Sequence, residues 1–185
     1  MIKLPRPIIY SMTDEEIESL KIQAQEISNC PVRSRGRSFE RCFAASKAGS
    51  ILEFALCHQG ATKNPKKFNV MDPDSYAWDV LWDEHKAEIK RKKFLSDDRT
   101  KWYSYTDPNH VKTFLKNIDL VDYFIVGDYK ILGENLYEVH WMFITKVGKN
   151  FKNYMQESVY NKGQMYYNHT RDKNYISLLG ATNEI

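Results

Sequence analysis

The chain has 185 residues, 42% of them hydrophobic and 14% aromatic, which is enough to bury one core and excludes a disordered protein. Its formal net charge of +3 is only mildly basic, so the distribution of charge must indicate any anionic partner. The N-terminal residues contain no apolar run typical of a signal peptide or membrane span, and the three cysteines have no CxxC spacing, so we expect one cytoplasmic domain over residues 1–185, with no membrane partner and no disulfide framework.

Two helices are predicted in the first third of the chain. Thr13 and Glu16 form a capping-box pattern, and the apolar spacing after them predicts a helix over residues 14–28. A second helix is predicted over residues 38–58, because Gln59-Gly60 follows as a stop signal. Along it runs a stripe of three small residues and one carboxylate, at spacings of three and four: Ser46, Gly49, Ser50 and Glu53.

Four arginines surround a glycine between these two helices: Arg33, Arg35, Arg37 and Arg41. Guanidinium groups and free backbone N–H groups just before a helix can bind phosphate. A solvated basic turn would have the same composition. We predict the four arginines as nucleic-acid contacts and keep the solvated turn as the alternative.

The most informative pattern lies in residues 76–93. Aromatic and branched side chains alternate with other residues over 76–82, which predicts a strand, and residues 87–91 predict its partner. Residues 83–86 are expected to form the loop of this hairpin.

In a hairpin with that loop, Trp82 lies opposite Ala87 and Asp79 lies opposite Lys90. Because strand side chains repeat every two residues, Asp79, Glu88 and Lys90 then share one face. Charged strand faces are often solvated cross-strand pairs. Two carboxylates beside an ammonium group are also suited to a metal site with an adjacent lysine.

Basic residues continue beyond the hairpin and lead to aromatic ones. Arg91, Lys92 and Lys93 come first, and Trp102 begins an aromatic cluster. Basic residues interleaved with aromatic ones are suited to a nucleic-acid backbone whose bases stack. A solvated face is the alternative interpretation.

The next part of the chain is expected to complete the sheet. Asp107-Pro108 predicts the start of a short helix. Strands are predicted at residues 121–126 and 136–145, with turns at Gly127-Asp128 and at residues 133–135 between them.

Two expectations concern the C-terminal part. Residues 149–160 are predicted to form a last helix, and residues 161–185 are rich in tyrosine. This tyrosine-rich extension could be a stacking surface, an edge for dimerisation or a cover for the sheet, and the sequence does not choose among them.

A helix with Glu53, a strand with Asp79 and a strand with Glu88-Ile89-Lys90 are followed by a helix, two strands and a helix. This order resembles the PD-(D/E)XK nuclease superfamily over about residues 38–160, and the size of the chain is similar to that of its small phage nucleases. The resemblance implies an α/β (α+β) fold with a restriction-endonuclease-like core, in which helices flank a central mixed β-sheet.

A second match to the motif pairs Pro73-Asp74 with Glu84-His85-Lys86. We reject it because Glu84 and Lys86 fall within the predicted polar turn rather than on a strand. The first match departs from the family pattern in having Trp78 before the aspartate.

The resemblance implies a Mg²⁺-dependent DNA endonuclease, in which Mn²⁺ could replace Mg²⁺. Asp79 and Glu88 would ligate the ion with the Ile89 carbonyl, Glu53 would complete the shell, and Lys90 would position or deprotonate the attacking water. Aromatic surface residues favour single-stranded or distorted DNA. Alternatives are a non-catalytic nucleic-acid-binding protein and a junction resolvase or RNase on the same fold. Many relatives dimerise, so a homodimer is a further expectation.

Overall fold

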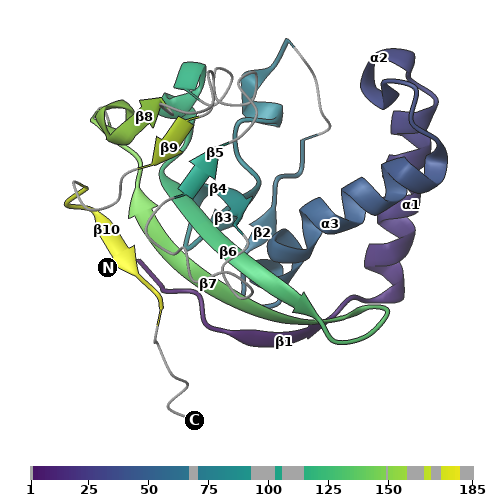
Figure 1. Ribbon diagram of the computed structural model, residues 1–185, viewed down its shortest axis with the longest axis horizontal. Coiled ribbons are helices and arrows are strands. Elements are labelled where there is room, and N and C mark those ends of the chain that lie inside the picture. The colour runs from purple at the N-terminus through teal and green to yellow at the C-terminus, as the bar shows by residue number, and fades with distance from the viewer. Residues whose placement is uncertain are drawn as a thin grey trace.

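The computed structural model describes residues 2–66, 71–92, 103–105, 115–148, 150–157, 165–167 and 172–179. It is a mixed α/β structure in which a curled β-sheet carries two long helices on one face and a small second sheet on the other (Figure 1). The predicted fold class is therefore confirmed at the level of a mixed sheet with helices. None of the described helices is long and apolar enough to cross a membrane.

Both long helices form where the capping signals predict them. Helix α1 covers Asp14–Ser28, and Thr13 and Glu16 make both bonds of the capping box, at 3.2 and 2.8 Å. Helix α3 covers Phe39–Cys57. A short helix α2, Pro31–Ser34, precedes it. The boundaries of α1 and α3 agree with the prediction to within one residue.

The larger sheet, counted over the described residues, has seven strands: β1 (Ile8–Ser11), β2 (Thr62–Lys63), β3 (Val80–Trp82), β4 (His85–Arg91), β6 (Tyr123–Ile131), β7 (Leu136–Lys146) and β10 (Tyr175–Ser177). Their order is β1-β7-β6-β4-β3-β2, and β10 pairs with β7 alongside β1. Only β4 and β6 are parallel among these described pairs. The sheet is thus mixed, as predicted.

The second sheet has the order β5-β9-β8 and consists of β5 (Tyr103–Tyr105), β9 (Met165–Tyr167) and β8 (Met155–Glu157). Strand alternation gives the larger sheet two buried faces. Ala87 and Ile89 of β4 belong to the core that packs on α3, whereas Phe124 of β6 packs with Phe151 and Tyr167 in the opposite core. In the described residues, the two long helices thus flank one face of the larger sheet, and the small sheet covers the other.

The β3–β4 hairpin differs from its predicted register by two residues. Its loop is the two-residue turn Asp83-Glu84, with φ of 51° and 65°, and Trp82 pairs with His85 rather than Ala87. Because a shift by an even number of residues keeps every side chain on its face, Asp79, Glu88 and Lys90 can still converge as predicted. The strand predicted over residues 76–82 begins only at Val80, and Trp78 packs in the core opposite to the one that contains Val80 and Trp82, so that part of the prediction is wrong. Lys86 belongs to β4, so its placement in the loop is wrong.

Strand β6 continues to Ile131 through Gly127-Asp128, where a turn is predicted. A bulge lies between Val126 and Gly127. A Cβ on Gly127 would lie 2.8 Å from the Trp141 ring and 2.9 Å from the His140 carbonyl oxygen. This glycine thus permits close packing against β7 and does not mark a turn.

The helix predicted over residues 149–160 is also wrong. Phe151–Tyr154 forms a single 3-10 turn, which leads into β8. In the tyrosine-rich extension, Tyr167 is fully buried, and β10 pairs with the edge of β7. Most of the short helix predicted after Asp107-Pro108 lies outside the described residues.

Candidate functional site

Asp79 lies directly before β3, where it is held from three directions. Its N–H donates to the Ala87 carbonyl at 2.9 Å, and its own carbonyl accepts from the Asn64 N–H at 2.9 Å. Its Oδ2 accepts from the Ile89 N–H at 2.7 Å. The carboxylate of Asp79 is therefore fixed against the part of β4 that contains Glu88 and Lys90.

The ammonium group of Lys90 lies among the groups predicted to ligate a metal. Its Nζ forms an ion pair with Glu88 Oε1, donates to the Ile89 carbonyl at 3.0 Å and lies 4.0 Å from Asp79 Oδ2. Glu88 Oε2 is buried and accepts no hydrogen bond from a donor among the residues that the structure describes, and a proton shared with the Asp79 carboxyl group is among the causes that raise the pKa of Glu88. The predicted convergence of Asp79, Glu88 and Lys90 is present, and one buried carboxylate oxygen remains unsatisfied within it.

Glu53 reaches the same region from α3. Its Oε2 forms an ion pair with Lys63 Nζ at 3.1 Å, and the Lys63 ammonium lies 4.2 Å from the centre of the Phe54 ring. Lys63 is on β2 and pairs with Val80, the residue after Asp79. Glu53, the fourth predicted site residue, thus lies beside Asp79. Lys63 lies with it, although the sequence did not predict Lys63 as a site residue.

Burial perturbs both glutamates. Loss of solvation, followed by the negative charge of Asp79, raises the pKa of Glu88 to about 8, although Lys90 opposes the rise. The same two causes raise the pKa of Glu53 to about 7, with Lys63 and Lys90 opposing them. Around neutral pH, the two lysines do not fully offset the cost of three ionised carboxylates, so the cluster favours either protons or an added cation.

Hard divalent cations prefer oxygen ligands such as carboxylates and carbonyls. In the described part of the chain, no three His, Cys, Asp or Glu side chains gather closely enough to hold a metal by themselves. Asp79, Glu88 and the Ile89 carbonyl are the residues that would hold it, and water would complete its shell. The unsatisfied buried oxygen of Glu88 is the observation that favours such an ion.

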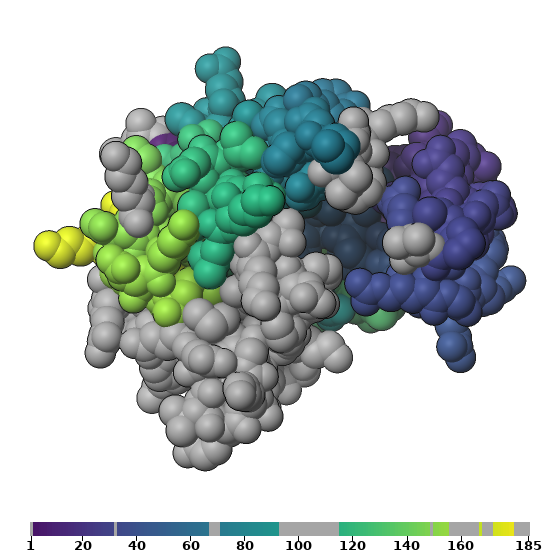
Figure 2. All heavy atoms as spheres, turned by 90° about the horizontal axis from the view of Figure 1, so that it is seen from above, coloured from purple at the N-terminus to yellow at the C-terminus, as the bar shows by residue number. Residues whose placement is uncertain are grey.

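The four predicted arginines belong to a helical lobe formed by α1, α2 and the first half of α3. Arg35, Arg37 and Arg41 are exposed and Arg33 is half-buried. The Arg37 guanidinium also donates to the carbonyls of Ser34 and Arg33, at 2.9 and 3.3 Å. At 1.5 Å per residue, Arg41 lies about 18 Å along α3 from Glu53. Figure 2 shows this lobe, coloured purple to blue, beyond a hollow that separates it from the blue-teal segment leading into β3.

Arg91 has a partner inside the protein. Its Nε lies 2.8 Å from Oδ1 of the buried Asp128, and its guanidinium carbon lies 3.7 Å from the centre of the Tyr129 ring. Lys92 follows β4, and its N–H donates to the Gly127 carbonyl. The other predicted nucleic-acid contacts in this stretch, Lys93 and Trp102, lie outside the described residues.

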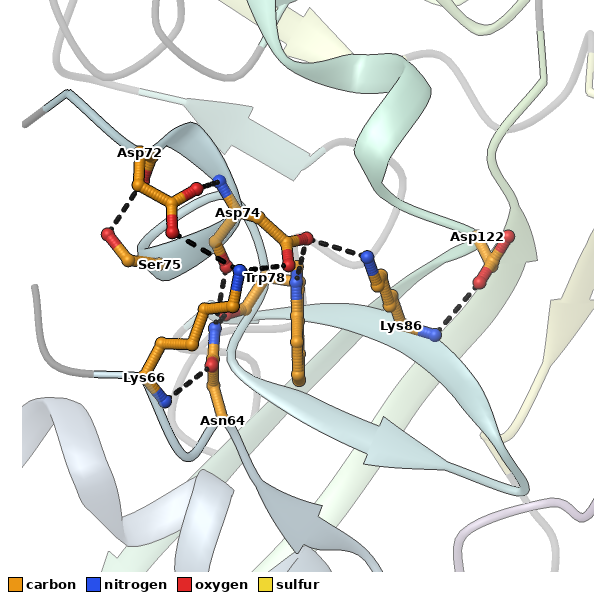
Figure 3. A network of polar contacts seen from close by, with 8 residues as sticks. All are labelled: Asn64, Lys66, Asp72, Asp74, Ser75, Trp78, Lys86 and Asp122. Carbon is orange, nitrogen blue, oxygen red and sulfur yellow. Dashed lines mark hydrogen bonds and ion pairs between the residues drawn. The ribbon is translucent and has the colours of Figure 1, made fainter. Parts of the chain in front are cut away.

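The rejected motif match does not form a second carboxylate site. Glu84 is exposed in the turn, whereas Asp74 is bound by Lys66, Lys86 and the Trp78 indole (Figure 3). The position of Glu84 in the turn is therefore as predicted when this match was rejected.

Lys63 and Asn64 carry no signal in the sequence that marks them as site residues, because β2 has only two residues, too few to produce a periodic pattern. No family model, curated protein or solved structure matches the chain. A functional assignment therefore depends on the geometry of Asp79, Glu88, Lys90 and Glu53.

Proposed function

We propose that the protein is a Mg²⁺-dependent DNA endonuclease built on a restriction-endonuclease-like core. The observation that carries this proposal is the convergence of Asp79, Glu88 and Lys90, with a buried oxygen of Glu88 unsatisfied among the described residues. Leaving a buried acceptor unsatisfied costs roughly 1–3 kcal/mol, so a purely structural ion-pair cluster would gain by satisfying it. A bound cation would satisfy it.

The order of the strands supports the same proposal. Parallel neighbours such as β4 and β6 require a long crossover connection, and the residues between them include the predicted helix after Asp107-Pro108. Helix α3, the β3–β4 hairpin and this crossover occur in the order that the resemblance to the PD-(D/E)XK superfamily predicts.

Each side chain has a distinct role in phosphodiester hydrolysis. Asp79 and Glu88, with the Ile89 carbonyl, would hold the ion, which offsets charge on the phosphate and lowers the pKa of a water molecule. The Ile89 N–H keeps the Asp79 carboxylate in place. Lys90 would turn from Glu88 towards the phosphate, counter its charge and orient the attacking water.

Glu53 and Lys63 would form the outer part of the site. Glu53 is 18% exposed at its side chain and Lys63 is 41% exposed, so the lysine lies nearer to solvent. Exposed arginines of the helical lobe, Arg35 and Arg41, would hold the nucleic-acid backbone at a distance from the reacting bond. A preference for single-stranded or distorted DNA is proposed from the aromatic content of the chain.

A cleavage assay tests this proposal on single-stranded, duplex and branched DNA, with Mg²⁺ or with EDTA. Wild type is compared with Glu88→Gln, Lys90→Met and the matched control Glu18→Gln, which changes an exposed glutamate of α1. We expect Mg²⁺-dependent cutting that falls at least about 100-fold in the two site variants and is unchanged in the control.

Failure of the wild type to cut any substrate, or equal cutting by the folded site variants, would refute the endonuclease assignment. Binding of DNA without cutting would indicate a non-catalytic nucleic-acid-binding protein. Preferential cutting of RNA or of branched DNA would indicate an RNase or a junction resolvase.

A further inference from the structure

Asn64 connects the end of β2 to the turn that leads into Asp79. Its Nδ2 donates to the Asp74 carbonyl at 3.1 Å and to the Trp78 carbonyl at 3.0 Å, and its Oδ1 accepts from the Lys66 N–H at 3.0 Å. Its own N–H donates to the Asp79 carbonyl at 2.9 Å. The Asn64 side chain thus holds the carbonyl before Asp79, and the Asn64 peptide group holds the carbonyl of Asp79 itself.

The turn is anchored on its other side by the Asp74 carboxylate (Figure 3). Lys66 Nζ lies 2.8 Å from Asp74 Oδ2, while Lys86 Nζ and Trp78 Nε1 lie 2.6 and 2.9 Å from Oδ1. Hydrogen bonds from Lys66, Lys86 and Trp78 hold the pKa of Asp74 well below its usual range. Asp74 therefore stays ionised, and it joins the turn to β4 two residues before Glu88.

The strand ladder alone does not fix Asp79. Strand β3 begins one residue later, at Val80, and the Asp79 side chain is 26% exposed. On the side away from β4, the Asp79 carbonyl is held by Asn64. Replacing the Asn64 side chain would leave this backbone bond in place but would remove the bonds to the Asp74 and Trp78 carbonyls, which releases the turn directly before Asp79.

We propose that Asn64 is a positioning residue, which orients Asp79 so that its carboxylate shares a divalent cation with Glu88. This inference rests on the proposed function, because it takes Asp79 and Glu88 as metal ligands. Residues that orient metal ligands through hydrogen bonds change metal affinity or activity by about 10–100-fold when they are replaced.

A structural clamp and a positioning residue make different predictions. Loss of a clamp lowers the midpoint of unfolding and leaves the cation affinity of the folded protein unchanged. Loss of a positioning residue weakens cation binding in the folded protein, and saturating cation restores the rate of cleavage.

The test uses Asn64→Ala and Asn64→Asp, each with Asn135→Ala as the matched control. Asn64→Asp keeps an acceptor for the Lys66 N–H but replaces the donating amide. Asn135 accepts from Lys47 Nζ at 2.7 Å in the turn between β6 and β7, so its replacement also removes a side-chain hydrogen bond. Circular dichroism confirms folding, and calorimetric titration with MgCl₂ in the absence of DNA gives the dissociation constant.

We expect the Mg²⁺ dissociation constant to rise about tenfold in both Asn64 variants and to stay at the wild-type value in Asn135→Ala. The Mg²⁺ concentration for half-maximal cleavage rises by a similar factor, while the rate at saturating Mg²⁺ returns to within about threefold of the wild type. If the Asn64 variants do not fold, Asp74→Asn tests the same anchor and is expected to weaken Mg²⁺ binding in the same direction.

An unchanged dissociation constant in folded Asn64 or Asp74 variants, beside a wild type that binds Mg²⁺ and cuts DNA, overturns the positioning role and leaves the proposed function standing. A wild type that neither binds Mg²⁺ nor cuts overturns the proposed function itself. The two failures are therefore distinct.

Discussion

The raised pKa of Glu88 predicts how the stability of the cation-free protein depends on pH. Below pH 4.5 the glutamate is protonated in both the folded and the unfolded chain. Between pH 4.5 and about 8 the folded protein retains a proton that the unfolded chain has released. The free energy of unfolding therefore falls as the pH rises through this window, and it is lowest above pH 8.

The size of this effect follows from the same values. A rise in pKa from 4.5 to about 8 corresponds to about 5 kcal/mol at most, since one pH unit is 1.36 kcal/mol. Relaxation around a buried charge reduces such costs, so we expect a loss of roughly 2–5 kcal/mol between pH 5 and pH 9. Glu53, with its pKa raised to about 7, adds a smaller loss in the same direction.

The perturbation that isolates Glu88 is Glu88→Gln, which keeps the shape of the side chain and removes its titration. Urea unfolding in EDTA, followed by circular dichroism from pH 5 to pH 9, measures the free energy of unfolding of both proteins. We expect the variant to be about 2 kcal/mol or more stable than the wild type at pH 9 and similar to it at pH 5. The remaining dependence of the variant's free energy of unfolding on pH measures the contribution of Glu53.

Mg²⁺ gives the complementary measurement at pH 8, close to the raised pKa of Glu88, where a bound cation favours the ionised carboxylate. At ten times its dissociation constant, Mg²⁺ should stabilise the wild type by about 1.4 kcal/mol and Glu88→Gln by much less. The control Glu18→Gln should have a free energy of unfolding that varies with pH in parallel with that of the wild type. If Glu88→Gln behaves in the same way in EDTA, the buried charge of Glu88 does not destabilise the folded state and the reasoning is refuted.

Three further outcomes are expected. Lys63→Met removes the cation that lowers the pKa of Glu53, so the acidic limb of the rate–pH profile for cleavage should move to higher pH. Gly127→Ala should lower the free energy of unfolding by about 1–3 kcal/mol in urea, because its Cβ would overlap the Trp141 ring, whereas Gly49→Ala in open space on α3 should not destabilise. Arg41→Ala should reduce the salt dependence of DNA binding by about one counterion and leave the rate at saturating DNA unchanged.

Local signals predicted the parts of the structure that depend on few residues. The capping box at Thr13 and Glu16 and the stop after residue 58 were sufficient for α1 and α3. The alternation of β4 placed Glu88 and Lys90 on one face even though the hairpin register was wrong by two residues. For the same reason the gathering of Asp79, Glu88 and Lys90 could be predicted from the sequence.

Other features depend on contacts between distant residues and could not be predicted. The turn at Asp83-Glu84 places two residues other than glycine at positive φ, and the Lys3 N–H supports it by donating to Asp83 Oδ2 at 3.0 Å. Gly127-Asp128 is a typical turn sequence, but Gly127 lies inside a strand because the Trp141 ring occupies the space that a Cβ would need. Both outcomes were decided by neighbours far away in the sequence.

The separation of the site residues along the chain also has a kinetic consequence. Glu88 and Lys90 lie near Asp79 in one hairpin, a local structure, whereas Glu53 meets them only after α3 packs on the sheet. β4 must also pair in parallel with β6, which is a slow, non-local event. If the cation site forms only at this late stage, Mg²⁺ should slow unfolding in stopped-flow experiments and leave the folding rate unchanged. The bound carboxylate cluster would then prolong the lifetime of the folded state without accelerating its formation.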